Sequence, residues 1–157
     1  MKSRRALETK GYLKNKMAKY IINPCDQISL TEKVFLSAVV REIDDKDISG
    51  YIKYLIRHSV VTCREVTFGC GMYVYFETFV LPKVRKPVPP NMRRMWETKI
   101  ADYPHGEPGN FVYLMLYLNQ DKTVLDFLEI TIAVSTEEPF DEWELAHMIM
   151  DKCFRAT

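Results

Sequence analysis

The sequence predicts an α+β domain: a four-stranded antiparallel sheet, built from two hairpins, with N-terminal helices and a C-terminal helix packed on one face. Three observations support this prediction. Apolar residues recur at helical spacing between 30 and 56, pairs of β-branched and aromatic runs lie within 60–81 and 111–134, and a helical pattern returns near 136. No repeat or linker interrupts this order, and 157 residues are enough for one hydrophobic core, so residues 1–157 are expected to form a single domain.

The first 22 residues are expected to form a basic helical arm. Seven of the first 20 residues are Lys or Arg and one is acidic, while Leu13, Met17 and Ile21 recur on one side. The arm should end before Pro24, because the residue preceding a proline is pushed out of the helical conformation.

Two further helices are predicted between 29 and 58. Ser29 and Glu32 form a capping-box pair, in which each side chain bonds the other residue's backbone N–H at the start of a helix. A break at 44–47 precedes a shorter helix with Ile48, Ile52 and Leu55 on one side.

The segment Asp45-Lys46-Asp47-Ile48-Ser49-Gly50-Tyr51-Ile52 looks like the first eight positions of an EF-hand calcium loop, with oxygen ligands at positions 1, 3 and 5 and glycine at position 6. The resemblance covers this stretch alone and fails at position 12, where the family has a bidentate Glu and this chain has Ile56. Asp45, Asp47 and Ser49 are therefore expected to form an inter-helix turn with N-cap chemistry, and no metal site is predicted.

The strands are predicted as two hairpins. The first pairs 60–68 with 72–81 across a Gly-Cys-Gly turn, and the second pairs 111–118 with 124–134. Between the hairpins, residues 82–99 are expected to form a basic, proline-rich loop that ends in a short helix over 91–103. The C-terminal helix is expected from about Thr136, with acidic residues in its first turn.

Charge is distributed unevenly along the chain. The formal net charge is only +1, which argues against a dedicated nucleic-acid binder. Residues 82–99, however, hold six basic residues and one acidic, and 136–157 hold two basic and six acidic. Separated fields of this kind can steer association with a partner.

The loop 82–99 is the predicted partner-binding segment. Its prolines make it a stiff arm suited to docking on protein, and arginines with an aromatic residue are typical interface anchors. The same residue types also suit phosphate contacts and base stacking, to which the N-terminal arm would add contacts. The predicted partner-binding residues are Lys83, Arg85, Lys86, Arg93, Arg94 and Trp96, and the additional nucleic-acid contacts are Arg4, Arg5, Lys10 and Lys14.

No motif in the chain indicates a reaction, and no catalytic residue or cofactor is predicted. Asp102, His105 and Glu107 combine an imidazole with two carboxylates, which suits acid–base work or a metal, but their spacing matches no known ligand pattern. Cys70, in the Gly-Cys-Gly turn, has no neighbouring base to activate it. An enzyme would need residues that meet only in three dimensions.

A membrane or secreted setting is not expected. The longest apolar run, 111–118, falls far short of the roughly 20 residues that span a bilayer, and no apolar stretch follows the basic N-terminus. We therefore expect a cytoplasmic protein whose four cysteines stay thiols; their spacings contain no CxxC pair that would suggest zinc.

Together these observations favour a non-enzymatic interaction protein, such as an adaptor, inhibitor or immunity-type binder, acting as a monomer or a homodimer. A protein partner is the first expectation. The alternatives are an RNA- or DNA-binding protein and a small enzyme built around the Asp102 loop.

Overall fold

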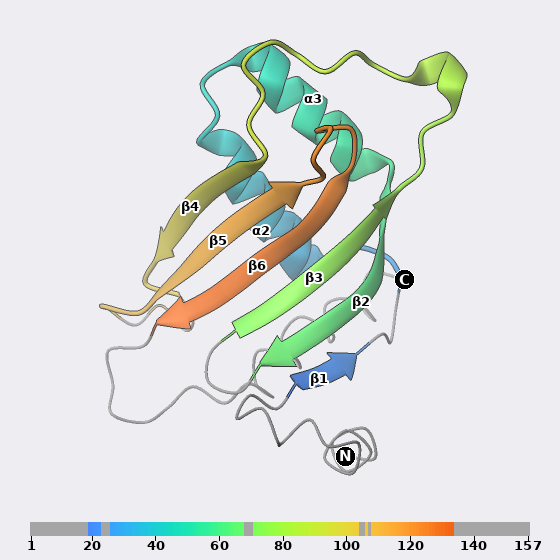
Figure 1. Cartoon of the computed structure of the whole chain (residues 1–157). Helices are drawn as coiled ribbons and strands as arrows, with labels where there is room; N and C mark the ends of the chain where they lie inside the picture. Colours follow the sequence, from blue (N-terminus) through green and yellow to red (C-terminus); the bar gives the residue numbers. More distant parts are fainter. Residues whose placement is uncertain (1–18, 23–25, 68–70, 104–105, 107, 134–157) are drawn as a thin grey trace.

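A computed structural model describes residues 19–22, 26–67, 71–103, 106 and 108–133, which form two α-helices behind a six-stranded antiparallel sheet (Figure 1). The predicted α+β class is confirmed. Along the chain the elements are β1 (Lys19–Ile22), α2 (Leu30–Arg41), α3 (Lys46–Arg57), β2 (Ser59–Thr67), β3 (Gly71–Thr78), the short 3-10 helix η2 (Pro82–Val84), β4 (Met95–Ala101), β5 (Phe111–Leu118) and β6 (Leu125–Ala133).

Both predicted helix starts are confirmed. Ser29 caps α2: its Oγ accepts a hydrogen bond from the Glu32 N–H at 3.1 Å, and its own N–H donates to Glu32 Oε1 at 2.8 Å. Asp45 caps α3, because its carboxylate accepts from the N–H groups of Asp47 and Ile48 at 2.9 and 3.2 Å. The carboxylate that resembled a calcium ligand thus serves to begin a helix.

The two predicted hairpins are present as β2–β3 and β5–β6, but the prediction of four strands is wrong. The strand order is β1-β2-β3-β6-β5-β4, so the hairpins join through β3 and β6, and each outer strand adds to one edge. The sequence patterns located the hairpins because their apolar runs are long. They missed β1, which is only four residues long, and β4, whose middle residues Glu97, Thr98 and Lys99 are polar.

β4 replaces the short helix that was predicted over 91–103. Asn91 has a φ of 62°, a left-handed conformation that does not continue into a helix. From Met95 the chain alternates, with Trp96 and Ile100 packed against the core while Glu97 and Lys99 are exposed. Cross-strand pairing with Phe111–Tyr117 of β5 therefore overrides the local helical pattern.

β1 corrects the end of the predicted helical arm. Lys19–Ile22 pair antiparallel with Thr67–Arg64 of β2, so these four residues form an edge strand. Tyr20, Ile21 and Ile22 are the aromatic and β-branched residues that suit a strand. The rest of the arm, 1–18, and the predicted C-terminal helix lie outside the described residues.

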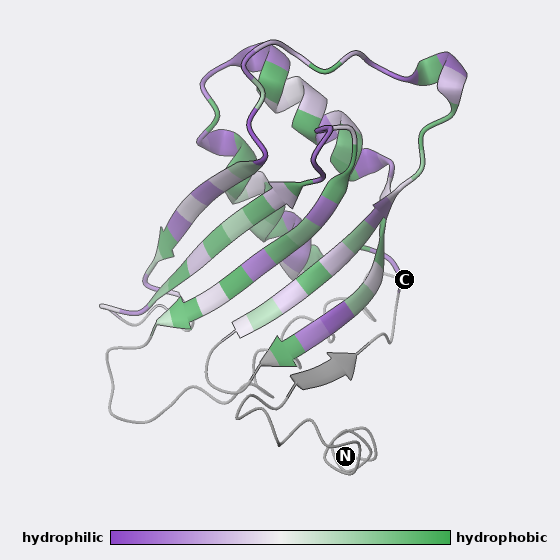
Figure 2. Ribbon diagram, viewed as in Figure 1, coloured by the Kyte–Doolittle hydropathy of each residue, from purple (hydrophilic) through white to green (hydrophobic). Residues whose placement is uncertain are grey.

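The core lies between the sheet and the helices. Alternate strand residues face α2 and α3, and the alternation of apolar and polar residues is visible along the strands in Figure 2. Fully buried side chains from both layers meet there, among them Phe35, Leu36, Val39, Ile52, Leu55, Val74, Leu114, Leu116, Leu128 and Ile130.

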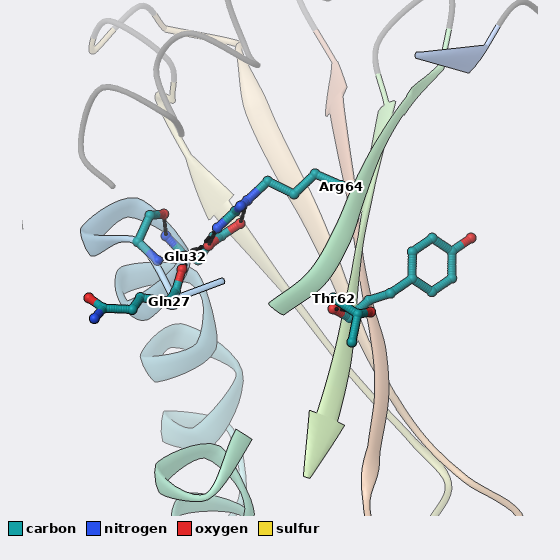
Figure 3. Close-up of polar contacts among 6 residues, drawn as sticks. Gln27, Glu32, Thr62 and Arg64 are labelled. Atoms are coloured by element: carbon teal, nitrogen blue, oxygen red, sulfur yellow. Dashed lines mark hydrogen bonds and ion pairs between the residues drawn. The ribbon is translucent and has the colours of Figure 1, made fainter. Parts of the chain in front are cut away.

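A buried ion pair ties the start of α2 to β2 (Figure 3). Arg64 Nε and Nη2 donate to Glu32 Oε2 and Oε1, both at 2.7 Å, and neither side chain is exposed to solvent. Arg64 faces the helices because a register shift between Val61 and Cys63 puts an extra residue, Thr62, into β2 and reverses the alternation beyond it.

The connection from β3 to β4, residues 79–94, is called the strap below because it crosses over α3 from the middle of the sheet to its edge (Figure 1). Tyr54 of α3 holds it in place: its Oη donates to the Val84 carbonyl at 2.8 Å and accepts from the Lys86 N–H at 3.3 Å. Met92, near the end of the strap, is buried. The basic loop predicted from sequence is thus a fixed crossover whose last five residues, 95–99, belong to β4.

Candidate functional site

A groove runs between α2 and α3 with a volume of about 640 Å³. Its apolar floor consists of Leu36 and Val40 from α2, Ile43 from the connection between the helices, and Ile56 from α3. Leu36, Val40 and Ile43 are themselves nearly buried, so the floor is continuous with the core. The groove therefore offers a partner an apolar surface that is already shaped.

All charged residues that line the groove are basic. Lys33 and Arg41 from α2 and Lys53 and Arg57 from α3 line it, all four are exposed, and no acidic residue contributes to its lining. Residues four apart share one side of a helix, so Lys33 and Arg41 flank Ser37, while Lys53 and Arg57 follow Ser49. Among the described residues, Arg64 and Glu32 form an ion pair, and none of the four rim cations takes part in one.

The apolar surface continues along the outer side of α2. A shallower hollow shares Lys33, Ser37 and Arg41 with the groove and adds Leu30 and Val34. Leu30 is 45% exposed and Val34 55% exposed. Together with the groove, these two side chains form an apolar surface that is flanked by cations.

The strap lies on the opposite side of α3 from the groove. A second hollow, of about 550 Å³, separates α3 from the strap and is lined by Lys46, Asp47, Gly50 and Tyr51 on the helix and by Lys86–Pro90 on the strap. The predicted contacts Lys83, Arg85, Lys86, Arg93 and Arg94 are all exposed along the strap. They lie near both ends of this crossover rather than in one pocket.

Trp96, the predicted aromatic anchor, is partly buried and packs against the core from β4. The Arg93 guanidinium lies 5.3 Å from its ring centroid, a cation–π contact within the protein. The indole Nε1 is buried without a hydrogen-bond partner. The ring face covered by Arg93 is thus already in use, which weakens the idea that a base stacks there.

Of the four residues named in the enzyme hypothesis, the structure describes Asp102 alone. Asp102 is exposed at the end of β4 with a φ of 57°, and its N–H donates to the Asn110 carbonyl at 2.7 Å. His105, Glu107 and Cys70 lie outside the described residues, as do the predicted nucleic-acid contacts Arg4, Arg5, Lys10 and Lys14.

Neither a metal cluster nor a reactive thiol is found in the described part of the chain. No three His, Cys, Asp or Glu side chains gather there in a way that would hold a metal ion. Burial, and then the Glu65 carboxylate, raise the pKa of the free Cys63 thiol, which keeps it protonated and weakly nucleophilic. Nor is any helix within the described ranges long and apolar enough to cross a membrane.

Sequence reasoning missed the groove. The signal was available in part: Lys33 and Arg41, and likewise Lys53 and Arg57, repeat on one side of their helices without an acidic partner nearby on that side. What a sequence pattern cannot show is that the two basic rows face each other across an apolar floor, because this depends on how α2 packs on α3.

Comparisons of the chain with protein-family models, with curated protein sequences and with solved structures gave no match. The function must therefore be argued from the groove itself.

Proposed function

We propose that this chain is a non-enzymatic protein-binding module that holds an acidic, amphipathic helix of a partner protein in the α2–α3 groove. The observation that supports the proposal is the combination of an apolar floor with four cations that have no acidic neighbour in the lining. Helix-in-groove recognition needs both features: the floor accepts apolar side chains at i, i+3, i+4 and i+7, and the rim pairs with charges beside them.

The two features have different roles in binding. Burial of apolar side chains on Leu36, Val40 and Ile56 would supply most of the affinity. The rim cations would fix orientation, exclude basic partners and speed association. A groove that was basic only would not distinguish carboxylates from phosphates, but the apolar floor gives an amphipathic helix the advantage.

The strap contributes to the same surface in this proposal. Its exposed Lys83, Arg85 and Lys86 extend the positive field to the other side of α3, so they would steer an acidic partner without lying under it. The partner-binding role predicted for these residues is thereby retained as a long-range effect that salt should screen.

Nucleic-acid binding is the second candidate. It is favoured by the cations that flank α3 on both sides, Lys53 and Arg57 in the groove and Lys83, Arg85 and Lys86 on the strap. Against it, phosphates gain nothing from the apolar floor, and the aromatic residues at the strap, Tyr54 and Trp96, are buried or packed on the core.

The experiment that tests the proposal is fluorescence anisotropy of the full chain with three matched peptides. The first is an amphipathic helix of Leu and Glu, the second has Lys for every Glu, and the third has Ser for every Leu. We expect the Leu/Glu peptide alone to bind, because the second loses charge complementarity and the third loses the contact with the floor.

Two charge-reversal variants then locate the site. Lys53→Glu with Arg57→Glu should weaken binding of the Leu/Glu peptide by at least about tenfold, because it removes two attractive contacts and introduces two repulsive ones. Lys83→Glu with Arg85→Glu changes the net charge equally on the strap and should weaken it by no more than about threefold at physiological salt. Equal effects of the two variants would contradict the assignment to the groove.

The nucleic-acid alternative has its own test in a salt titration of short RNA and DNA strands. If it is correct, Arg93→Ala with Arg94→Ala should lower the slope of log affinity against log salt by about two. Tight oligonucleotide binding together with no binding of the Leu/Glu peptide would replace the first proposal by the second.

A further inference from the structure

β4 is an edge strand of the sheet formed by the described residues. It is the last strand in the order β1-β2-β3-β6-β5-β4, and within the described ranges β5 is its only pairing partner (Figure 1). All seven residues, Met95–Ala101, are paired on the β5 side, so an equally long row of backbone groups lies along the other side. Such an edge is a template for another strand unless it is blocked.

Two backbone hydrogen bonds at the ends of β4 show which groups point outward. The Arg94 carbonyl accepts from the Leu118 N–H at 2.7 Å, and the Asp102 N–H donates to the Asn110 carbonyl at 2.7 Å, so the backbone of these even-numbered residues points toward β5. The N–H and C=O groups of successive residues in an antiparallel strand point alternately to its two sides. The N–H and C=O groups of Met95, Glu97, Lys99 and Ala101 therefore point away from the sheet, toward the open edge.

The side chains of Glu97 and Lys99 make this edge self-complementary. Both are exposed and lie on the sheet face opposite the helices, where Glu97 is paired with Met115 and Lys99 with Tyr113. Lys99 Nζ lies 3.9 Å from the Phe111 ring centroid on that face. No ion pair within the described residues engages either side chain.

We propose that two copies of this chain associate through antiparallel pairing of β4 with β4, about a two-fold axis at Thr98. Glu97 of each copy then lies opposite Lys99 of the other, twice, within reach of a cross-strand ion pair. Trp96 and Ile100, both only partly buried, lie opposite each other on the helix side of the joined sheet. About eight backbone hydrogen bonds form, two for each outward-facing residue pair.

The alternation of the backbone leaves few other registers. Outward-pointing residues must face outward-pointing residues, so the strands can slip only by two residues at a time. An axis at Glu97 sets Glu97 against itself, and an axis at Lys99 sets Lys99 against itself, in both cases opposing like charges. The axis at Thr98 is also the one that overlaps all seven residues of β4.

Sedimentation equilibrium of the full chain tests this pairing. The wild-type chain is expected to show a concentration-dependent dimer. Lys99→Glu alone and Glu97→Lys alone should each raise the dimer dissociation constant by at least about tenfold, because each turns two attractive cross-strand pairs into two repulsive ones. The double exchange Glu97→Lys with Lys99→Glu should restore the dimer. Because this variant also lacks the Lys99–Phe111 contact, its recovery would show that the cross-strand charges, and not that contact, determine the dissociation constant.

A mixing experiment makes the test specific to the antiparallel register. The Lys99→Glu chain presents two carboxylates and the Glu97→Lys chain presents two ammonium groups, so an equimolar mixture is expected to form a heterodimer although each chain alone is weakened. A wild-type chain that is monomeric up to about 1 mM would overturn the proposal. So would a dimer that the two single variants leave unchanged, or a mixture that does not associate.

Discussion

The buried pair Glu32–Arg64 shows how single residues determine the join between the helical layer and the sheet. Glu32 accepts three hydrogen bonds, two from Arg64 and one from the Ser29 N–H, so it serves the ion pair and the capping box together. Arg64 Nη2 also donates to the Gln27 carbonyl at 3.0 Å. The segment that leads into α2 is thereby fixed to β2.

Removal of one partner of this pair should destabilise the protein strongly. Arg64→Met leaves the Glu32 carboxylate buried without its counter-ion, and we expect the free energy of unfolding to fall by about 3–5 kcal/mol. Adding Glu32→Gln removes the buried charge but retains the N3 capping side chain, so the double variant should recover much of the loss. Urea unfolding measures both, and a double variant no more stable than Arg64→Met would contradict this explanation.

Tyr51 should make the protein sensitive to alkali. Burial, and then Tyr54, raise its pKa from the ordinary 10.0, against an opposing effect of Arg85, and its Oη donates to the Lys122 carbonyl at 3.0 Å. The folded state thus favours the neutral phenol, whose contribution is complete below the unfolded pKa and is lost as pH rises through the folded value. The temperature at the midpoint of thermal unfolding should therefore decrease as the pH rises above about 10, and it should decrease less steeply in Tyr51→Phe.

Burial also raises the pKa of Tyr103. Because Tyr103 is present in both proteins, it contributes equally to the loss of stability of the wild-type chain and of Tyr51→Phe. Identical pH profiles for the wild-type chain and Tyr51→Phe would show that the Tyr51 phenol plays no part in the loss of stability.

The strap is the element whose role differs most from its sequence pattern. Its charge and prolines suggested a free recognition arm, but its backbone is held on α3 by Tyr54 and its end is buried through Met92. The prolines suit a crossover because they stiffen a segment that must run from the middle of the sheet to its edge.

Tyr54→Phe should loosen the strap without affecting the groove. The substitution removes the hydrogen bonds to Val84 and Lys86, so we expect a loss of about 1–2 kcal/mol of stability and faster amide exchange over 83–88. Binding of the Leu/Glu peptide should stay within about twofold of wild type, since the groove lies on the other side of α3. Unchanged exchange in the strap would mean that it is held by other contacts.

The elements were predictable where local chemistry determines them. Ser29 and Asp45 mark the starts of their helices in the sequence because their side chains accept hydrogen bonds from backbone N–H groups two or three residues away. β4 was not predictable, because its strand conformation comes from β5, and the Thr62 bulge was not, because it depends on the register with β3. Local signals thus gave the helices and hairpins, and non-local pairing gave the rest.

At the scale of the whole molecule, α3 lies between two basic regions of different kinds. On one side the cations rim an apolar groove, and on the other they lie along a fixed crossover. The sequence predicted that basic residues bind a partner, but it placed the binding site on the strap. The groove residues Lys53 and Arg57 needed the packing of α2 beside α3 to be recognised as a site.

The central claim is that a partner helix lies in the α2–α3 groove, and the most direct test is hydrogen–deuterium exchange of the full chain with and without the Leu/Glu peptide. We expect the peptide to slow exchange in 33–41 and 49–57, which line the groove, and to leave the strap at 79–94 unchanged. Slower exchange in the strap with no change in the two helices would contradict the claim and return the binding site to the basic crossover.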